Sequence, residues 1–346
     1  MANIMLNTVC NLGCPYCFAR SLVHPDSEEN REHPDNITLE DFQKALNFAV
    51  HDRKDARIGI IGGEPTLHPD FREIMKTMFF DDRVTKITVF TNGLEIDRHI
   101  SELLHPKVGM LVNLNPPERI GEDKFSRIIE NLDKLIRGYH MWHRVTLGIN
   151  MSGANFPYRY VLETLERYGM NHVRTSIVVP NREEMRQMDP LEYFKSMKPY
   201  VFEFFAELKK RNIMPTYDCN YMPPCILSDE ELKWLKSFWD LEKKAGRYCN
   251  IADYSKCGPV LDILPSLKAV RCFGLSYKEQ VPIDSFKNIG ELKDYFYNVY
   301  DAYAFKVHVS NQCRRCPAAL KMRCMGGCIA FKDEKIDRAK ELLASV

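Results

Sequence analysis

Three cysteines with short, unequal spacing lie close to the start of the chain. Cys10, Cys14 and Cys17 form a C-x3-C-x2-C motif that has no fourth cysteine nearby. A structural zinc site takes four protein ligands, commonly from two C-x2-C pairs. A [4Fe-4S] cluster held by three thiolates instead leaves one iron open, where a substrate or cofactor can bind. The motif therefore favours a catalytic iron–sulfur site, and a three-ligand zinc knuckle is the alternative.

A glycine-rich turn forms the second candidate motif. Gly62, Gly63, Glu64 and Pro65 directly follow an apolar run. Two glycines let the backbone approach a ligand closely, Glu64 can face a positive group, and Pro65 fixes the direction in which the chain leaves. A tight turn from strand to helix, with no ligand, is the alternative.

The elements that must position these motifs alternate between strands and helices. Short apolar runs predict strands at 3–9, 57–61, 86–91, 109–114, 145–151 and 173–179. The segments between them carry apolar residues at i, i+3, i+4 and i+7, as helices do; one begins at a predicted cap, Thr38. Parallel strands joined by helices make an α/β fold, either a partial barrel or an open doubly wound sheet. In both, ligands gather at the carboxyl ends of the strands.

The pattern changes in the last third of the chain. We predict two domains, a β/α domain over 1–215 and a cysteine-rich domain with a connecting helix over 216–346. The second is rich in loops, with a hairpin expected around Pro265. A segment with so little secondary structure rarely forms a stable core by itself, so we expect bound metal to stabilise it.

Charge and cysteine content narrow the class of protein. The 346 residues include 48 Lys and Arg against 47 Asp and Glu, so no excess charge favours nucleic acid or an anionic membrane as a partner. The chain shows neither an export signal nor a run near the ~18 apolar residues of a membrane span, and we expect a cytoplasmic protein. Its 12 cysteines are then reduced thiols, which indicates metal rather than disulfides.

The two N-terminal motifs together resemble the signature of the radical S-adenosylmethionine (SAM) superfamily. The cysteine motif follows the first strand, has Tyr16 before its third cysteine, and is accompanied by the GGEP sequence at 62–65. The resemblance implies a partial (β/α)6 barrel whose open iron chelates the amino and carboxylate groups of SAM. It also implies that one electron splits the sulfonium C–S bond of SAM, and that the resulting 5′-deoxyadenosyl radical abstracts hydrogen from a substrate.

The resemblance also implies contacts to the cofactor. The GGEP backbone, Gly62 to Pro65, would bind the methionine ammonium. Polar residues late in strands four and five, Asn113 and Asn150, would face the ribose and carboxylate, and Tyr16 would lie beside the cluster. For Asn92 and Asn115, at the ends of strands three and four, turn formation is an equal alternative.

The C-terminal cysteines resemble the SPASM extension of radical SAM enzymes that modify peptides and proteins. That extension holds two auxiliary [4Fe-4S] clusters. Carried over, the first cluster takes Cys249, Cys257, Cys272 and Cys328. The second takes Cys313, Cys316 and Cys324.

The resemblance leaves two of the cluster ligands unassigned. No cysteine follows Cys328, so the second cluster needs Cys219, Cys225, another group or an open iron, unless it is absent. The first ligand of the first cluster could be Cys219, Cys225 or Cys249, and we favour Cys249 because it lies nearest to Cys257 in the sequence. A four-cysteine zinc site in the C-terminal run is the alternative.

The function that this resemblance implies is radical modification of a peptide or protein side chain, by oxidation, cross-linking or epimerisation. The alternative is a twitch-type dehydrogenase of a small molecule such as a sugar or aminocyclitol. A flavodoxin- or ferredoxin-type electron donor is expected, and a leader peptide would be gripped by the barrel, the tail or a separate subunit. Phe273 stands where sulfatase-maturing relatives carry a catalytic Asp, and Asp218 is a candidate base. The sequence names neither the substrate nor the bond formed.

Overall fold

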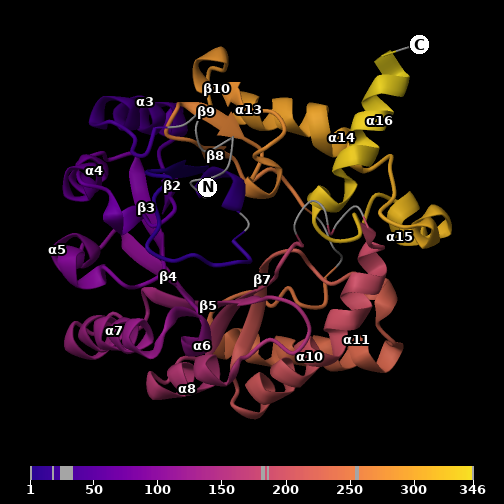
Figure 1. Ribbon diagram of the computed structural model, residues 1–346, viewed down its shortest axis with the longest axis horizontal. Helices are drawn as coiled ribbons and strands as arrows, with labels where there is room; N and C mark the ends of the chain where they lie inside the picture. The colour runs from indigo at the N-terminus through magenta and orange to yellow at the C-terminus, as the bar shows by residue number, and fades with distance from the viewer. Residues whose placement is uncertain are drawn as a thin grey trace. The chain divides into compact units, whose positions relative to one another are not determined.

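The computed structural model describes residues 2–17, 19–23, 34–180, 184, 187–253 and 257–344. Contacts divide the chain into two compact units, each made of two segments: Met1–Leu147 with Pro259–Phe296, and Gly148–Gly258 with Tyr297–Val346. Figure 1 shows the elements of both units. The predicted division at residue 215 stays a prediction, because these units group residues by contact and not by function.

A mostly parallel sheet runs through the first unit. Strands β1 to β4 are parallel neighbours in chain order, β8 pairs parallel with β1, and β9 and β10 continue antiparallel. The bounds are β1 Ala2–Met5, β2 Ala56–Ile61, β3 Val84–Thr91, β4 Val108–Leu114, β8 Asp262–Ile263, β9 Lys268–Val270 and β10 Val281–Pro282. The hairpin predicted around Pro265 is confirmed, and it extends the N-terminal sheet beside β1.

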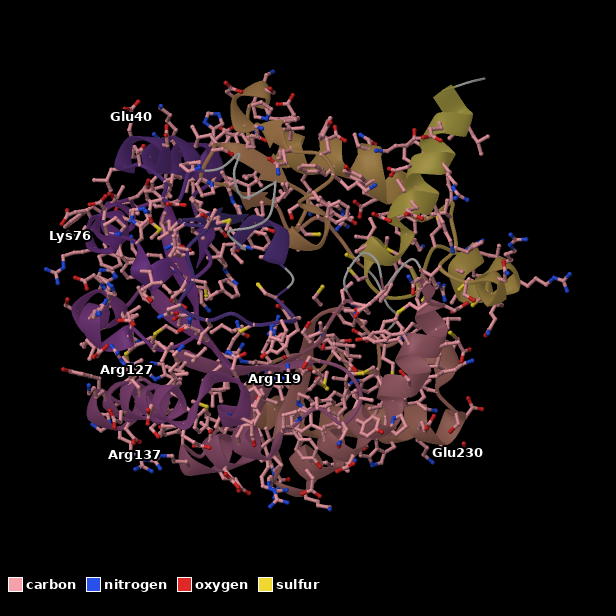
Figure 2. The ribbon with its side chains drawn as sticks, viewed as in Figure 1. Glu40, Lys76, Arg119, Arg127, Arg137 and Glu230 are labelled. Carbon is pink, nitrogen blue, oxygen red and sulfur yellow. The ribbon has the colours of Figure 1, made fainter. Side chains whose placement is uncertain are left out.

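Helices alternate with the parallel strands of this unit. In α3, Leu39–Val50, the predicted cap Thr38 accepts a hydrogen bond from Asp41 N at 3.0 Å. Charged side chains such as those of Glu40, Lys76 and Arg137 project from the outer helices (Figure 2). The other helical segments are α1 Arg20–Val23, η1 Pro65–Leu67, α4 Phe71–Phe79, η2 Ile96–His99, α5 Ile100–Leu103, α6 Pro117–Ile120, α7 Glu122–Asp133, the π-helical η3 Lys134–Gly138, η6 Phe273–Leu275, η7 Ile283–Ser285 and α13 Ile289–Phe296.

The second unit combines three parallel strands with one long helix. β5, Val145–Met151, begins in the first unit and ends in the second, where β6, His172–Ile177, pairs with it and with β7, Met214–Cys219. The predicted α/β class, with parallel strands joined by helices, is confirmed. The helical segments are α8 Arg159–Arg167, α10 Pro190–Lys210, η4 Pro224–Ile226, α11 Asp229–Lys236, η5 Ser237–Leu241, α12 Glu242–Ala245, η8 Tyr297–Asp301, α14 Ala302–Ala304, η9 Asn311–Arg315, α15 Pro317–Leu320, η10 Ile329–Lys332 and α16 Asp333–Ala344.

Buried aromatic side chains of α10 fix the C-terminal segment of the second unit. Phe194 and Phe205 are almost fully buried. The Phe194 ring lies 5.8 Å from that of Phe331 in η10, and the Phe205 ring lies 6.1 Å from that of Phe238 in η5. The first contact attaches the end of the cysteine run to α10, and the second packs η5 against the same helix. In the described part of the chain, no helix has the length and apolar character needed to cross a bilayer.

A buried carboxylate ties the β8–β9 hairpin to β1. Asp262 is 1% exposed. Its Oδ1 accepts from Asn3 Nδ2 at 2.7 Å, and its Oδ2 accepts from Phe273 N at 3.1 Å. Phe273 directly follows Cys272, so this carboxylate also positions a predicted metal ligand.

We expect Asp262→Ala to destabilise the first unit, because it leaves two buried donors without an acceptor. Each such donor costs about 1–3 kcal/mol. The measurement is the thermal unfolding midpoint, followed by circular dichroism. Asp284→Ala, at an exposed position in η7 of the same unit, is the control. Equal midpoints for the two variants would contradict the structural role of Asp262.

Candidate functional site

The cysteine loop is held against the glycine-rich turn by backbone hydrogen bonds. Beyond β1, Leu6 N donates to Ile61 O at 2.8 Å, Gly63 N to Asn7 O at 2.9 Å, and Glu64 N to Val9 O at 2.8 Å. The two motifs are therefore adjacent, as strand-end placement predicted.

The two glycines of the turn are required by this close approach. A Cβ on Gly63 would lie 2.3 Å from Val9 O and 3.0 Å from Cys10 N. A Cβ on Gly62 would lie 2.3 Å from Asn7 Oδ1. The glycines thus make room for the cysteine loop itself, and their predicted approach to a ligand stays a prediction.

Glu64 holds the ends of β2 and β3 together through its buried carboxylate. Its Oε1 accepts from Thr66 Oγ1 at 2.6 Å and Thr91 Oγ1 at 2.8 Å, and its Oε2 accepts from Asn92 N at 2.7 Å. Burial raises the pKa of Glu64, while these hydrogen bonds lower it. Pro65 begins the 3-10 turn η1, whose N-cap is Glu64. The carboxylate organises the site, and its predicted cofactor contact remains a prediction.

The three N-terminal thiols lie near one another, and their environment disfavours the charged form. Burial, together with the charges of Glu64 and Cys17, raises the pKa of Cys10 to about 11. Burial, together with repulsion from Cys17 and Cys10, raises the pKa of Cys14 to about 12. Each of the three thiols thus interacts with the other two. Bound metal would supply the positive charge that the thiolates need.

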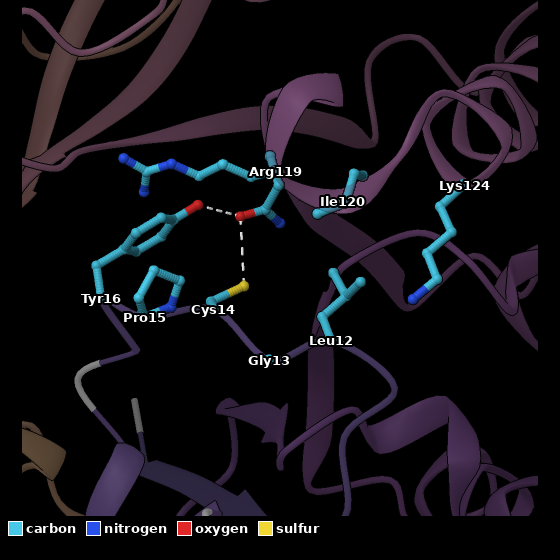
Figure 3. Close-up of a pocket in the computed structure, with 9 residues that line it drawn as sticks. Leu12, Gly13, Cys14, Pro15, Tyr16, Arg119, Ile120 and Lys124 are labelled. Carbon is cyan, nitrogen blue, oxygen red and sulfur yellow. Dashed lines mark hydrogen bonds between the residues drawn. The ribbon is translucent and has the colours of Figure 1, made fainter.

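A polar pocket opens beside Cys14 within the first unit (Figure 3). The Tyr16 hydroxyl and the Cys14 thiol, at 3.5 Å, both donate to Asn115 Oδ1. The Arg119 guanidinium lies over the Tyr16 ring, 5.0 Å from its centroid. The lining residues are Leu12, Gly13, Cys14, Pro15, Tyr16, Asn115, Arg119, Ile120 and Lys124. The pocket therefore offers two cations and one amide next to a candidate cluster ligand.

The other predicted cofactor contacts have separate surroundings. Asn113 is half-buried on β4, and its carbonyl accepts from Asn115 Nδ2 at 3.4 Å. Asn150 belongs to the second unit, where its Oδ1 accepts from Arg174 Nη1 at 2.7 Å. The candidate base Asp218 pairs with Arg174 as well, at 2.7 Å. The cofactor roles of both asparagines stay predictions.

Cys219, one of the open candidates, contacts the last cysteine of the run. The Cys328 thiol hydrogen-bonds to Cys219, which is the main cause of the lowered pKa of Cys219. The backbone supports the contact, because Cys328 N donates to Asn220 Oδ1 at 3.0 Å. Cys249 is buried, and its thiol faces the Pro215 carbonyl at 3.8 Å and the charges of Glu242 and Asp253. Cys219 is thus the better-placed alternative, although the assignment of Cys249 stays a prediction.

The remaining predicted cysteines divide between the units. Cys257 N donates to Met325 Sδ at 3.4 Å, which places Cys257 beside the C-terminal run. Cys272 belongs to the first unit, where Arg271 Nη1 lies 3.6 Å from its thiol. The predicted first auxiliary set draws on both units and stays a prediction. In the second unit, the thiols of Cys313, Cys316 and Cys324 interact with one another.

Sequence reasoning missed the two cations of the pocket. Both residues follow β4. Arg119 lies on the short helix α6, and Lys124 lies in the first turn of α7, where its Nζ donates to Asn11 O at 3.4 Å. The available signal was their position just after the polar end of a strand, where ligands of α/β folds gather. Asn115, which the sequence left equally open to turn formation, contacts the cysteine loop directly.

Comparisons with known proteins identify a family. The profile of the radical SAM superfamily matches residues 4–189. Curated relatives include GTP 3′,8-cyclases of Vibrio vulnificus, 25% identical over 138 residues, and of Photorhabdus laumondii, 26% identical over 137 residues. Each alignment covers 38% of this chain and 40% of the relative. The matched part is thus less than half the length of these relatives.

Solved structures share the fold over nearly the whole chain. Streptococcus suis SuiB bound to S-adenosylmethionine has a TM-score of 0.61 at 15% identity, covering 96% of this chain and 73% of that one. SuiB bound to the precursor peptide SuiA has a TM-score of 0.58 at 15% identity, covering 96% and 72%. This likeness extends through the C-terminal cysteine region.

The residues at the N-terminal site fit the [4Fe-4S] cluster and SAM that this family uses. Cys10, Cys14 and Cys17 offer three soft thiol ligands that interact mutually and need a cation to ionise. The neighbouring pocket carries Arg119 and Lys124, which suit an anionic carboxylate.

We expect Gly63→Ala to reduce iron binding at the N-terminal site, because the added carbon forces the Val9–Cys10 backbone to move. After anaerobic reconstitution, iron analysis should show the loss of about four irons, the content of one cubane. Gly13→Ala, in the same loop but with no atom within 4 Å of the added carbon, is the control. Equal iron content in the two variants would show that the close approach does not matter for the site.

Proposed function

Because this chain belongs to the radical SAM superfamily, we propose that it cleaves S-adenosylmethionine reductively and abstracts hydrogen from a side chain of a peptide or protein. When bound, the cluster supplies the electron that splits the sulfonium C–S bond and so generates the 5′-deoxyadenosyl radical. The observation that carries the proposal is the grouping of Cys10, Cys14 and Cys17, whose thiols interact electrostatically, beside a polar pocket. The protein's own part is to hold these thiols, to bind the methionine end of SAM and to exclude water from the radical.

The peptide substrate is supported by the C-terminal part of the chain. The likeness to SuiB, a protein solved with a precursor peptide, covers 96% of this chain and includes the cysteine-rich segment. The second unit also groups thiols suited to auxiliary clusters, which we propose as part of the enzyme. Arg314, Arg315, Lys321 and Arg323 are exposed beside these thiols. Such a basic surface suits an acidic donor of the flavodoxin or ferredoxin type.

A small-molecule substrate is the second candidate. The curated relatives that match 38% of this chain are named GTP 3′,8-cyclases, and GTP is a small molecule. The alignment leaves more than half of this chain uncovered. The likeness to SuiB over the whole chain therefore favours the peptide.

The first test of the proposed function is reductive cleavage of SAM. Anaerobically reconstituted enzyme, treated with dithionite, should convert SAM to methionine and 5′-deoxyadenosine, measured by liquid chromatography. The Cys10→Ala/Cys14→Ala/Cys17→Ala variant should form neither, because it lacks the ligands of the open cluster. An inactive wild-type enzyme would overturn the proposal.

The same assay distinguishes the two substrate classes. Peptides encoded by short reading frames beside the gene should raise 5′-deoxyadenosine formation and change mass in tandem mass spectrometry. GTP at the same concentration should do neither. Stimulation by GTP with no change in any peptide would favour the small-molecule alternative.

Arg119 is proposed to bind the carboxylate of SAM, because its guanidinium lines the pocket beside Cys14. Arg119→Gln should raise the KM for SAM about three- to tenfold, a modest effect because the side chain is exposed to solvent. The iron content should stay at the wild-type level. Arg137→Gln, at an exposed position in η3, is the control and should leave KM unchanged. Equal KM values for the two variants would contradict the proposed role of Arg119 in binding SAM.

A further inference from the structure

The second unit places a fourth thiol beside the three cysteines that the sequence left without a closing ligand. Cys225 lies in η4, a single 3-10 turn far earlier in the chain. Its thiol interacts with those of Cys324, Cys313 and Cys316. Because these three also interact pairwise, every pair among the four thiols lies within the range of electrostatic interaction. The four cysteines therefore form one group, here called the thiol quartet.

The three C-terminal members of the quartet are brought together by tight local turns. Cys313 N donates to Ser310 O at 3.1 Å, and Cys316 N donates to Cys313 O at 3.1 Å. Cys324 returns to the same region because its N donates to Ala318 O at 3.2 Å. Gly326 N also donates to the Cys324 thiol at 3.3 Å. Backbone N–H groups directed at sulfur are a means of tuning an iron–sulfur cluster.

The turn that carries Cys225 is fixed from several sides. Pro223 and Pro224 restrict the backbone on its N-terminal side, with Pro223 at φ −65°. Lys198 of α10 donates from Nζ to Ile226 O at 3.1 Å and to Glu231 Oε2 at 3.0 Å. Glu231 belongs to the capping box of α11 with Ser228. The thiol is thus presented by an anchored turn and not by a free loop.

A buried lysine supplies positive charge beside the quartet. Lys332 is 4% exposed, and its Nζ donates to Ala304 O at 2.7 Å. The thiols of Cys313, Cys324 and Cys257 interact electrostatically with its ammonium group. A lysine is rarely buried unless it is paired. A cluster with four thiolate ligands carries net negative charge, which would give this buried ammonium its partner.

A cubane cluster accepts thiolate ligands that stand farther apart than the ligands of a single metal ion. Among the residues that the structure describes, no three Cys, His, Asp or Glu side chains are close enough to share one metal ion. Thiolates bound at about 2.3 Å to one tetrahedral zinc lie roughly 3.8 Å apart. In a cubane each thiolate binds a different iron, so the ligands stand farther apart. Four cysteine thiolates are the usual donor set of such a cluster.

We propose that Cys225, Cys313, Cys316 and Cys324 are the four protein ligands of the second auxiliary iron–sulfur cluster. Cys225 then replaces the closing cysteine that the C-terminal sequence lacks. The inference rests on the proposed function only in that it assumes auxiliary clusters; it is independent of the substrate class.

The test counts iron in full-length protein whose N-terminal cluster has been removed. The parent is the Cys10→Ala/Cys14→Ala/Cys17→Ala variant, reconstituted anaerobically with iron and sulfide. We expect about eight irons per chain, from two auxiliary cubanes. Adding Cys225→Ala should lower the count by about one to four irons, because a cubane that loses one thiolate degrades to a three-iron cluster or is lost. Electron paramagnetic resonance should show a new [3Fe-4S] signal or the loss of one reduced-cluster signal.

A matched variant in the same turn separates ligation from folding. Leu227→Ala, at the C-cap of η4, should keep the iron content and the spectrum of the parent. Unchanged iron and unchanged spectra in the Cys225→Ala variant would overturn the assignment, as would zinc in place of iron in the parent. Loss of iron on Cys225→Ala, in an enzyme that modifies no peptide, would sustain the assignment while the proposed substrate class fails.

Discussion

Two backbone hydrogen bonds hold the N-terminal site together, and the rest of its geometry depends on them. Gly63 N to Asn7 O and Glu64 N to Val9 O join the end of β2 to the chain that enters the cysteine loop. The join leaves no space for a side chain at Gly63. Without these hydrogen bonds, ordering a loop that carries three metal ligands would cost a large amount of conformational entropy. Its first ligand is instead placed by the parallel sheet itself.

The charged and ionisable groups at this site favour a bound cation. The Glu64 carboxylate is buried and stabilised by donors from Thr66, Thr91 and Asn92. It adds to the negative potential at Cys10, which already lies near two other thiols. A buried set of this kind is costly unless positive charge enters it. The raised thiol pKa values and the carboxylate therefore both disfavour the ionised site without metal.

In the second unit, a few contacts likewise position the segments that carry the cysteines. The helix α10 contacts the cysteine run through Phe194, whose ring packs against Phe331. The same helix holds the turn of Cys225 through Lys198. One long helix thus carries both ends of the thiol quartet. An α-helix is a rigid support for such a site, since its backbone hydrogen bonds are satisfied internally.

The sequence by itself determined the elements and the kind of chemistry. Apolar periodicity predicted parallel strands joined by helices, and the spacing of Cys10, Cys14 and Cys17 indicated an open cluster, because both patterns reflect local geometry. Only the tertiary structure decided which distant residues meet. Arg119 beside Tyr16, Cys219 at Cys328 and Cys225 among the C-terminal thiols have no signature in spacing, since chain folding sets contacts between residues far apart in sequence. The thiol of Cys249, which proximity along the chain favours as a ligand, faces the Pro215 carbonyl, and its assignment stays a prediction.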